Sequence, residues 1–124
     1  MKLEEIVKLL KADIYTPDNY DGNMEINYAF ASDLMSDALV LLKTAPVEFF
    51  DQGMLITGLV TKQSIRTAQM LDYKVVIIVR GKKPVDNVFE LANEEDITVI
   101  GTDLSMFSAA GLLYQSGIKG SSEL

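Results

Sequence analysis

Residues 74–81 read KVVIIVRG and hold five consecutive apolar β-branched side chains, from Val75 to Val79. A short run that is apolar at every position is typical of a strand buried on both faces. Strands of this kind occur mainly in parallel or mixed sheets with helices packed above and below. The stretch therefore predicts an α/β fold in which residues 75–79 form a central strand.

The chain after residue 53 alternates between short apolar runs and segments with helical spacing of apolar residues. Strands are predicted at residues 54–57, 75–79 and 97–100, each followed by a helix. Thr61 and either Thr102 or Asp103 are expected to cap the first and last of these helices. Pro84 suits the first turn of the helix between them. Each crossover is long enough for right-handed parallel pairing of the strands.

The N-terminal part of the sequence supplies further elements. The predicted elements are a helix from residue 3 to about residue 12, a short strand at residues 14–15, a loop at residues 16–23, and a strand at residues 24–31. Ser32 and Asp33 suit the N-cap and first turn of a helix over residues 34–42. That helix is apolar round much of its circumference, so we expect it to be largely buried. Residues 47–51 fit either a turn of helix or a loop.

Length and composition limit the possible functions. The chain has 124 residues, a net charge of −7, and neither cysteine nor histidine. The size fits one domain, with residues 119–124 as a flexible tail. The acidic charge disfavours nucleic-acid binding, and the missing residue types exclude disulfides, thiolate metal sites and histidine-dependent catalysis. We expect a cytoplasmic protein that is not an enzyme, with no cofactor, no metal and no membrane segment.

The predicted parallel strands would bring their C-terminal ends to one edge of the sheet, where ligands of open α/β folds tend to bind. The residues expected at that edge as a ligand site are Thr57, Gly58, Thr61, Arg80, Gly81, Lys82, Gly101 and Thr102. Their glycines, free helix N–H groups and basic side chains fit a small anion or a nucleotide. An alternative is that the glycines end strands and the basic side chains are solvated. The glycine-rich loops of P-loop enzymes and dinucleotide-binding domains are absent from the sequence.

A second polar cluster follows the strand predicted at residues 24–31. It consists of Ser32, Asp33, Ser36 and Asp37. Two carboxylates four residues apart on a helix can hold Mg²⁺ or exchange protons. The alternative is a helix cap followed by a solvated first turn, where the helix dipole favours acidic residues.

Several blocks of the sequence together resemble the DRTGG domain. The blocks are SDLMSD after a strand, an Ile-Thr-Gly strand end, VVIIVRGKKP, and SMFSAAGLLYQSGI near the end, and they cover about residues 25–118. The chain departs from the family because residues 24–28 replace the Asp-Arg-Thr-Gly-Gly string. It also departs because Thr61, Lys62 and Gln63 stand where the family often has His and Asn.

The resemblance implies a mixed, largely parallel sheet with helices packed on it, in a single layered domain like the N-terminal domain of HPr kinase/phosphorylase. It implies a regulatory or sensory module without catalysis of its own, working with a protein partner that the sequence does not name. We therefore expect a module that binds a small anionic ligand, with a ligand-free dimerisation or assembly module as the alternative. A homodimer is expected because related domains self-associate. A Mg²⁺-dependent enzyme using Asp33 and Asp37 is the least favoured hypothesis.

Overall fold

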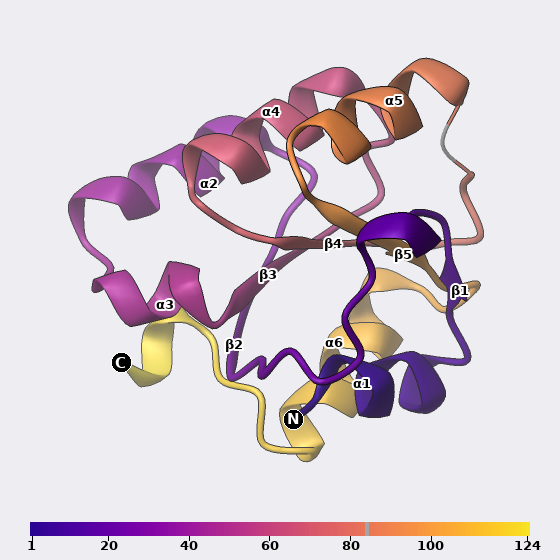
Figure 1. The fold of residues 1–124 in the computed structure, drawn as a ribbon. Coiled ribbons are helices and arrows are strands. Elements are labelled where there is room, and N and C mark those ends of the chain that lie inside the picture. The colour runs from indigo at the N-terminus through magenta and orange to yellow at the C-terminus, as the bar shows by residue number, and fades with distance from the viewer. Residues whose placement is uncertain (84) are drawn as a thin grey trace.

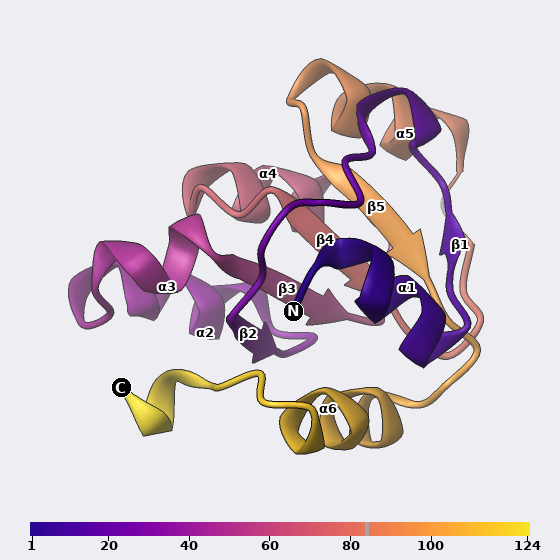
Figure 2. The same cartoon turned by 60° about the horizontal axis from the view of Figure 1, so that its bottom comes forward.

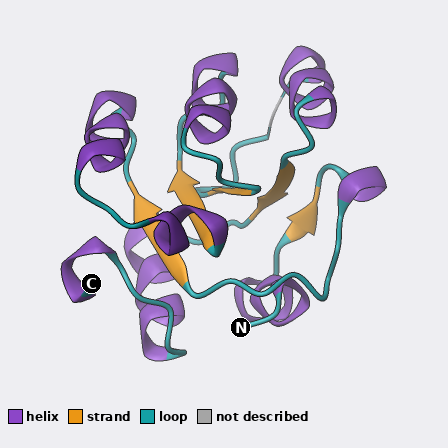
Figure 3. Cartoon of the chain, turned by 60° about the vertical axis from the view of Figure 1, so that its left-hand side comes forward, coloured by secondary structure: helices purple, strands orange, loops and turns teal. Residues whose placement is uncertain are grey.

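The computed structural model describes residues 1–83 and 85–124, and its centre is a five-stranded sheet with helices on both faces (Figures 1 and 3). The strands are β1 (Asp13–Ile14), β2 (Tyr28–Ala31), β3 (Gly53–Thr57), β4 (Val75–Ile78) and β5 (Thr98–Gly101). The α-helices are α1 (Leu3–Leu10), α2 (Met35–Val40), α3 (Val47–Asp51), α4 (Lys62–Met70), α5 (Asp86–Glu94) and α6 (Met106–Gln115). Short 3₁₀ helices are η1 (Pro17–Asn19), η2 (Leu41–Lys43) and η3 (Ser121–Glu123).

The sheet is mixed but largely parallel. Its strand order is β1-β5-β4-β3-β2, in which β2 to β5 are parallel and β1 runs antiparallel to β5 at one end. The predicted fold class is therefore confirmed: a single α/β domain with helices packed on a mixed sheet. The parallel order also brings the C-terminal ends of four strands to one edge.

Two apolar layers enclose the sheet. One contains buried side chains of α2, α3, α4 and α5, and the other contains buried side chains of α1 and α6. Figure 2 shows α6 across the face of the sheet that also carries α1. On β4, Val76 and Ile78 enter the first layer, whereas Val75 and Ile77 enter the second. Each of these side chains is at most 1% exposed, as expected for a strand buried on both faces.

Two predicted helix starts are wrong. Helix α2 begins at Met35 with Leu34 as its N-cap, so Ser32 and Asp33 precede the helix. Helix α6 begins at Met106, and its cap is Ser105, whose hydroxyl accepts a hydrogen bond from Ser108 N–H. Asp33 and Thr102 use their side chains for contacts outside these helices, and Ser32 bonds to the cap residue Leu34. Thr61, by contrast, caps α4 as predicted, and Pro84 lies outside the described residues.

Other boundaries also differ from the expectations. Of residues 24–31, Tyr28–Ala31 form β2, and Glu25 makes an isolated bridge to Lys2. The segment 34–42 is not largely buried: Leu34, Val40 and Leu42 are 58%, 60% and 49% exposed. The six residues of α2 turn one face to the core, through Met35 and Ala38, and the other outward.

The C-terminal segment lies against β2. At the start of the segment 119–124, for which we expect a flexible tail, the Lys119 N–H donates to Asn27 O at 3.0 Å and the Lys119 carbonyl accepts from Ala29 N–H at 3.0 Å. Residues Ser121–Glu123 then form η3. Within the described residues, no helix has the length and apolar character needed to cross a membrane.

Candidate functional site

The candidate site lies where β2, β3, β4 and β5 end. Four loops leave this edge of the sheet, directly after Ala31, Thr57, Ile78 and Gly101. Open α/β sheets bind ligands outside this edge, because the loops there converge and their sequences are free of the packing demands of the strands.

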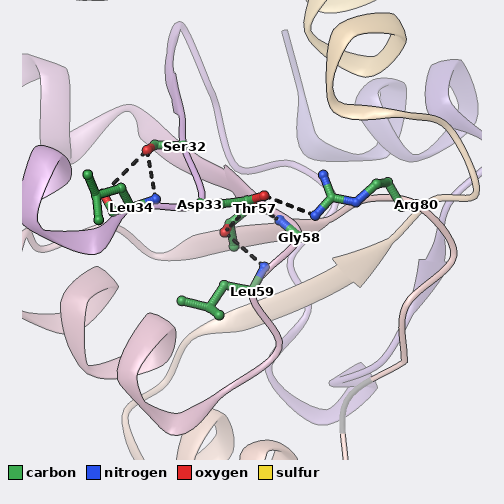
Figure 4. A network of polar contacts seen from close by, with 7 residues as sticks. All are labelled: Ser32, Asp33, Leu34, Thr57, Gly58, Leu59 and Arg80. Carbon is green, nitrogen blue, oxygen red and sulfur yellow. Dashed lines mark hydrogen bonds and ion pairs between the residues drawn. The ribbon is translucent and has the colours of Figure 1, made fainter.

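The carboxylate of Asp33 joins three of these strand ends (Figure 4). Its Oδ1 accepts hydrogen bonds from Gly58 N–H at 2.6 Å and from the Thr57 hydroxyl at 3.2 Å. Its Oδ2 accepts from Arg80 Nη2 at 2.9 Å, which makes an ion pair. Asp33, which follows β2, therefore binds both the start of the loop after β3, at Gly58, and the side chain of Arg80, which follows β4.

These contacts stabilise the ionised form of Asp33. The hydrogen bond from Gly58 N–H is the main cause that lowers the pKa of Asp33 below its ordinary value of 3.8. Burial, the second-largest cause, raises the pKa, whereas the hydrogen bond and charge of Arg80 and the hydrogen bond from Thr57 lower it further. Asp33 is therefore ionised at neutral pH, and its carboxylate holds the guanidinium of Arg80 in place.

The backbone also fixes Arg80. Arg80 and Gly81 have φ values of 65° and 66°, in the left-handed region that side chains other than glycine rarely adopt. Hydrogen bonds hold this turn, from Arg80 N–H to Leu104 O at 2.8 Å and from Gly81 N–H to Thr102 O at 2.9 Å. A strained residue that is held by its surroundings at the end of a strand is a recurring feature of functional sites.

Gly58 makes room for the arginine. A β-carbon on Gly58 would overlap the guanidinium group of Arg80. The guanidinium thus lies close against the start of the loop after β3, with the Arg80 side chain 39% exposed. Its position is set from three sides: by Asp33, by the Gly58 backbone and by its own turn.

The structure brings part of the predicted ligand site together. Thr57, Gly58 and Arg80 meet around Asp33, and Gly81 completes the turn. Lys82 is exposed nearby in the chain. The sequence predicts Asp33 in the other cluster, with Ser32, Ser36 and Asp37, because its link to Thr57 and Arg80 depends on the pairing of β2 with β3.

Three other predicted ligand residues have structural contacts. Thr61 caps α4 by accepting a hydrogen bond from Ser64 N–H at 3.3 Å. Gly101 lies under the ring of Tyr15, which a β-carbon at that position would overlap. The buried hydroxyl of Thr102 donates to Leu10 O at 2.8 Å and so connects the loop after β5 to α1.

The second predicted cluster does not form a shared helix face. Ser32 makes a turn in which its hydroxyl accepts from Leu34 N–H at 3.0 Å. Asp33 turns to Gly58 and Arg80, while Ser36 and Asp37 lie exposed in the first turn of α2. Among residues 1–83 and 85–124, no three Asp or Glu side chains are grouped so that they could hold a metal ion.

Comparison with solved structures gives a match to the CBS and DRTGG domains of the regulatory region of a Clostridium perfringens pyrophosphatase, complexed with the activator diadenosine tetraphosphate. The TM-score is 0.64 at 22% sequence identity, and the match covers 94% of this chain. It supports a DRTGG-like fold. The chain spans 47% of the length of that neighbour. No family model matches the sequence, and no curated protein matches it.

Proposed function

We propose that the chain is a regulatory module without catalysis of its own, which binds a small anionic ligand of the nucleotide class and signals through protein contacts. The observation that carries this proposal is the placement of Arg80. Its guanidinium is held at the C-terminal edge of a parallel sheet by the carboxylate of Asp33, 2.9 Å away, and by the close approach of Gly58.

The chemistry of Arg80 suits a phosphate. A guanidinium presents five N–H donors in a rigid fork that matches two phosphate oxygens. Within the described residues, Asp33 is the one hydrogen-bond acceptor of this side chain. The remaining donors can face solvent, because the side chain is 39% exposed. Lys82, which is also exposed, adds positive charge close by in the chain.

Ligand binding would change the contacts of Asp33. A phosphate that takes the guanidinium weakens its bond to Asp33, whose carboxylate also holds Gly58 N–H and the Thr57 hydroxyl. The residue after Asp33 is Leu34, the N-cap of α2, and it is 58% exposed. The event at Arg80 is therefore connected to Leu34, one of the exposed apolar side chains of residues 34–42, and a partner protein can sense it there.

Calorimetric titration of nucleotides, with tripolyphosphate as the base-free probe, tests the proposal. Diadenosine tetraphosphate belongs in the set because the similar pyrophosphatase region is complexed with it. We expect binding by the wild type, loss of binding in Arg80→Ala, and unchanged binding in the matched variant Arg66→Ala, which removes an exposed arginine on α4. A ligand at 100 times its Kd should also stabilise the fold by about 2.7 kcal/mol. Binding that survives Arg80→Ala contradicts the proposed site.

An assembly module is the second candidate. Large apolar side chains are exposed on two parts of the surface: Leu34, Val40, Leu42 and Val47 around α2 and α3, and Phe107 and Tyr114 on α6. Contiguous exposed apolar surface is typical of interfaces between protein chains. This candidate predicts a dimer by light scattering that Val40→Asp dissociates. Val85→Asp, which changes another exposed valine, next to α5, should leave the dimer intact.

A further inference from the structure

A pocket of about 300 Å³ lies between β2, α6 and the C-terminal segment. Its apolar wall includes Ile56 of β3 and Leu113 of α6, and its rim includes Tyr114. Residues 118–123 close one side, because Lys119 is hydrogen-bonded to the edge of β2. Figure 2 shows this segment passing from the end of α6 to β2. The proposed contact of Arg80 with an anion does not use this pocket.

The pocket ends next to Asp33 and Gly58. Two of its lining residues, Ala31 and Ile56, are paired in register near the C-terminal ends of β2 and β3. Asp33 follows Ala31 by two residues, and Gly58 follows Ile56 by two residues. Two residues span at most about 7 Å of extended chain. The pocket and the ion pair of Arg80 are therefore neighbours along two adjacent strands.

The backbone of β2 supplies a polar group at the pocket. Ser32 N–H bonds to Ile56 O and Tyr28 N–H to Gln52 O, so alternate residues of this strand face β3. The N–H groups of Ala29 and Ala31 consequently point to the other side, where Ala29 N–H meets Lys119 O. For Ala31 N–H, no acceptor is found within residues 1–83 and 85–124. This donor belongs to a residue that lines the pocket.

The size and lining of the pocket fit a flat ring with polar edges. A volume of about 300 Å³ is at the lower end of the range for ligand sites, which is roughly 300–1,000 Å³. It therefore suits a ring system better than a whole nucleotide. Lys119 and Glu123 both line the pocket and carry opposite charges, so the pocket does not favour an ionised group. The ring of Tyr114, 62% exposed at the rim, is available for stacking.

We infer that the ligand is bound in two parts: a heteroaromatic ring enters the pocket between β2 and α6, and an attached anionic group reaches Arg80. This inference rests on the proposed anion site and adds the recognition of a base to it. The Ala31 N–H is the donor that contacts the ring edge, and the loop that carries Asp33 lies between the two parts. A ligand of this class is a nucleotide with its phosphates at the sheet edge.

The test compares probes with and without a base. The probes are ATP, GTP, CTP, UTP and tripolyphosphate, each titrated without divalent cations. We expect at least one nucleotide to bind the wild type about tenfold tighter than tripolyphosphate. Ala110→Phe, which places a ring in the pocket, should reduce that affinity to the level of tripolyphosphate and leave tripolyphosphate binding unchanged. Arg80→Ala should abolish the binding of both kinds of probe.

A matched control lies at the next position of α6. No atom lies within 4 Å of a β-carbon built on Gly111, so Gly111→Phe adds the same ring to solvent and should leave every affinity unchanged. In amide NMR spectra, the nucleotide should shift Ala31 and Ala110 as well as Gly81, while tripolyphosphate should shift Gly81 without Ala110.

Each outcome separates the two proposals. Equal binding of nucleotides and tripolyphosphate, with no effect of Ala110→Phe, would overturn the ring pocket and leave the Arg80 site standing. Nucleotide binding that Ala110→Phe weakens and Arg80→Ala does not would show the pocket without the anion site, and would overturn the two-part arrangement. Absence of binding by all probes would overturn both proposals.

Discussion

The guanidinium group of Arg80 lies over the α-carbon of Gly58, so closely that a β-carbon there would overlap its Cζ and Nη2 atoms. The same guanidinium donates to Asp33, whose other oxygen accepts from Gly58 N–H. Gly58 thus contributes twice to the site, through its N–H and through its lack of a side chain.

Gly58→Ala should displace Arg80 from Asp33. The atoms that a methyl group would meet are the mobile end of a long side chain, so the backbone need not move. Because the ion pair is partly exposed, its loss should lower the free energy of unfolding by less than about 1 kcal/mol. The affinity for anions should fall, since the guanidinium loses its fixed position. Urea denaturation and calorimetry measure the two effects, and an unchanged affinity would contradict the role of this contact.

Gly53→Ala should be far more destabilising. A β-carbon at residue 53 would overlap the backbone carbonyl of Phe49 and the ring of Tyr73, and both residues are at most 1% exposed. The backbone of α3 is packed and cannot move aside, whereas the end of the Arg80 side chain, which a methyl group on residue 58 would meet, can. Overpacking of this kind costs about 1–3 kcal/mol. Urea denaturation of Gly53→Ala and Gly58→Ala measures the two losses of stability. Equal stability of the two variants would contradict the claim that the packed backbone of α3 leaves no room for a side chain at residue 53.

The sheet was predictable because its signals are local. Five apolar β-branched residues identify β4, and Thr61 lies at the right spacing to cap α4, so both can be found without knowledge of the rest of the fold. The starts of α2 and α6 were missed for the opposite reason. Asp33 and Thr102 have the chemistry of caps but bond to Gly58 and Leu10, which are distant in the sequence.

The candidate site was predictable only in outline. Parallel strands place Gly58 and Arg80 at one edge, and this part of the expectation follows from the order of the elements. The position of Asp33 depends on the parallel pairing of β2 with β3, which periodicity does not reveal. The pocket beside α6 depends on Lys119 pairing with β2, within a segment whose composition is typical of a flexible tail.

Asp33→Asn should show how the carboxylate contributes to stability. Asparagine can still accept from Gly58 N–H but does not attract Arg80. The pKa of Asp33 is lowered in the folded protein, so its stabilisation is present above the ordinary value of 3.8 and is lost as pH falls through the folded pKa. The variant should therefore be less stable than the wild type at neutral pH, by less than about 1 kcal/mol for a pair this exposed.

Urea denaturation of both proteins over a pH series measures this difference. The two stabilities should converge in acid, where Asp33 of the wild type is protonated. A difference that persists below the folded pKa would show that the variant is destabilised through the bond to Gly58 N–H.

Tyr73→Phe should stabilise the protein. The ring of Tyr73 packs against Phe49 and Phe50, with centroids 6.2 and 5.6 Å away, and these contacts do not need the hydroxyl. Among the described residues, this buried hydroxyl has no hydrogen-bond partner. An unsatisfied buried polar group costs about 1–3 kcal/mol. Thermal denaturation should therefore give a higher Tm for the variant, whereas Tyr114→Phe, which removes an exposed hydroxyl beside Glu123, should not raise the Tm.

The same substitution should alter the alkaline limit of stability. Burial raises the pKa of Tyr73 above its ordinary value of 10.0, so the folded protein keeps the phenol neutral while the unfolded chain releases its proton. The part of the free energy of unfolding that depends on the protonation of Tyr73 has its full value below pH 10.0. It declines as the pH rises towards the pKa of Tyr73 in the folded protein. The wild type should lose stability in this range relative to Tyr73→Phe. Parallel stability curves above pH 10.0 would mean that the folded protein releases this proton as readily as the unfolded chain, against the raised pKa. A lower Tm for the variant would mean that the hydroxyl has a hydrogen-bond partner in solution.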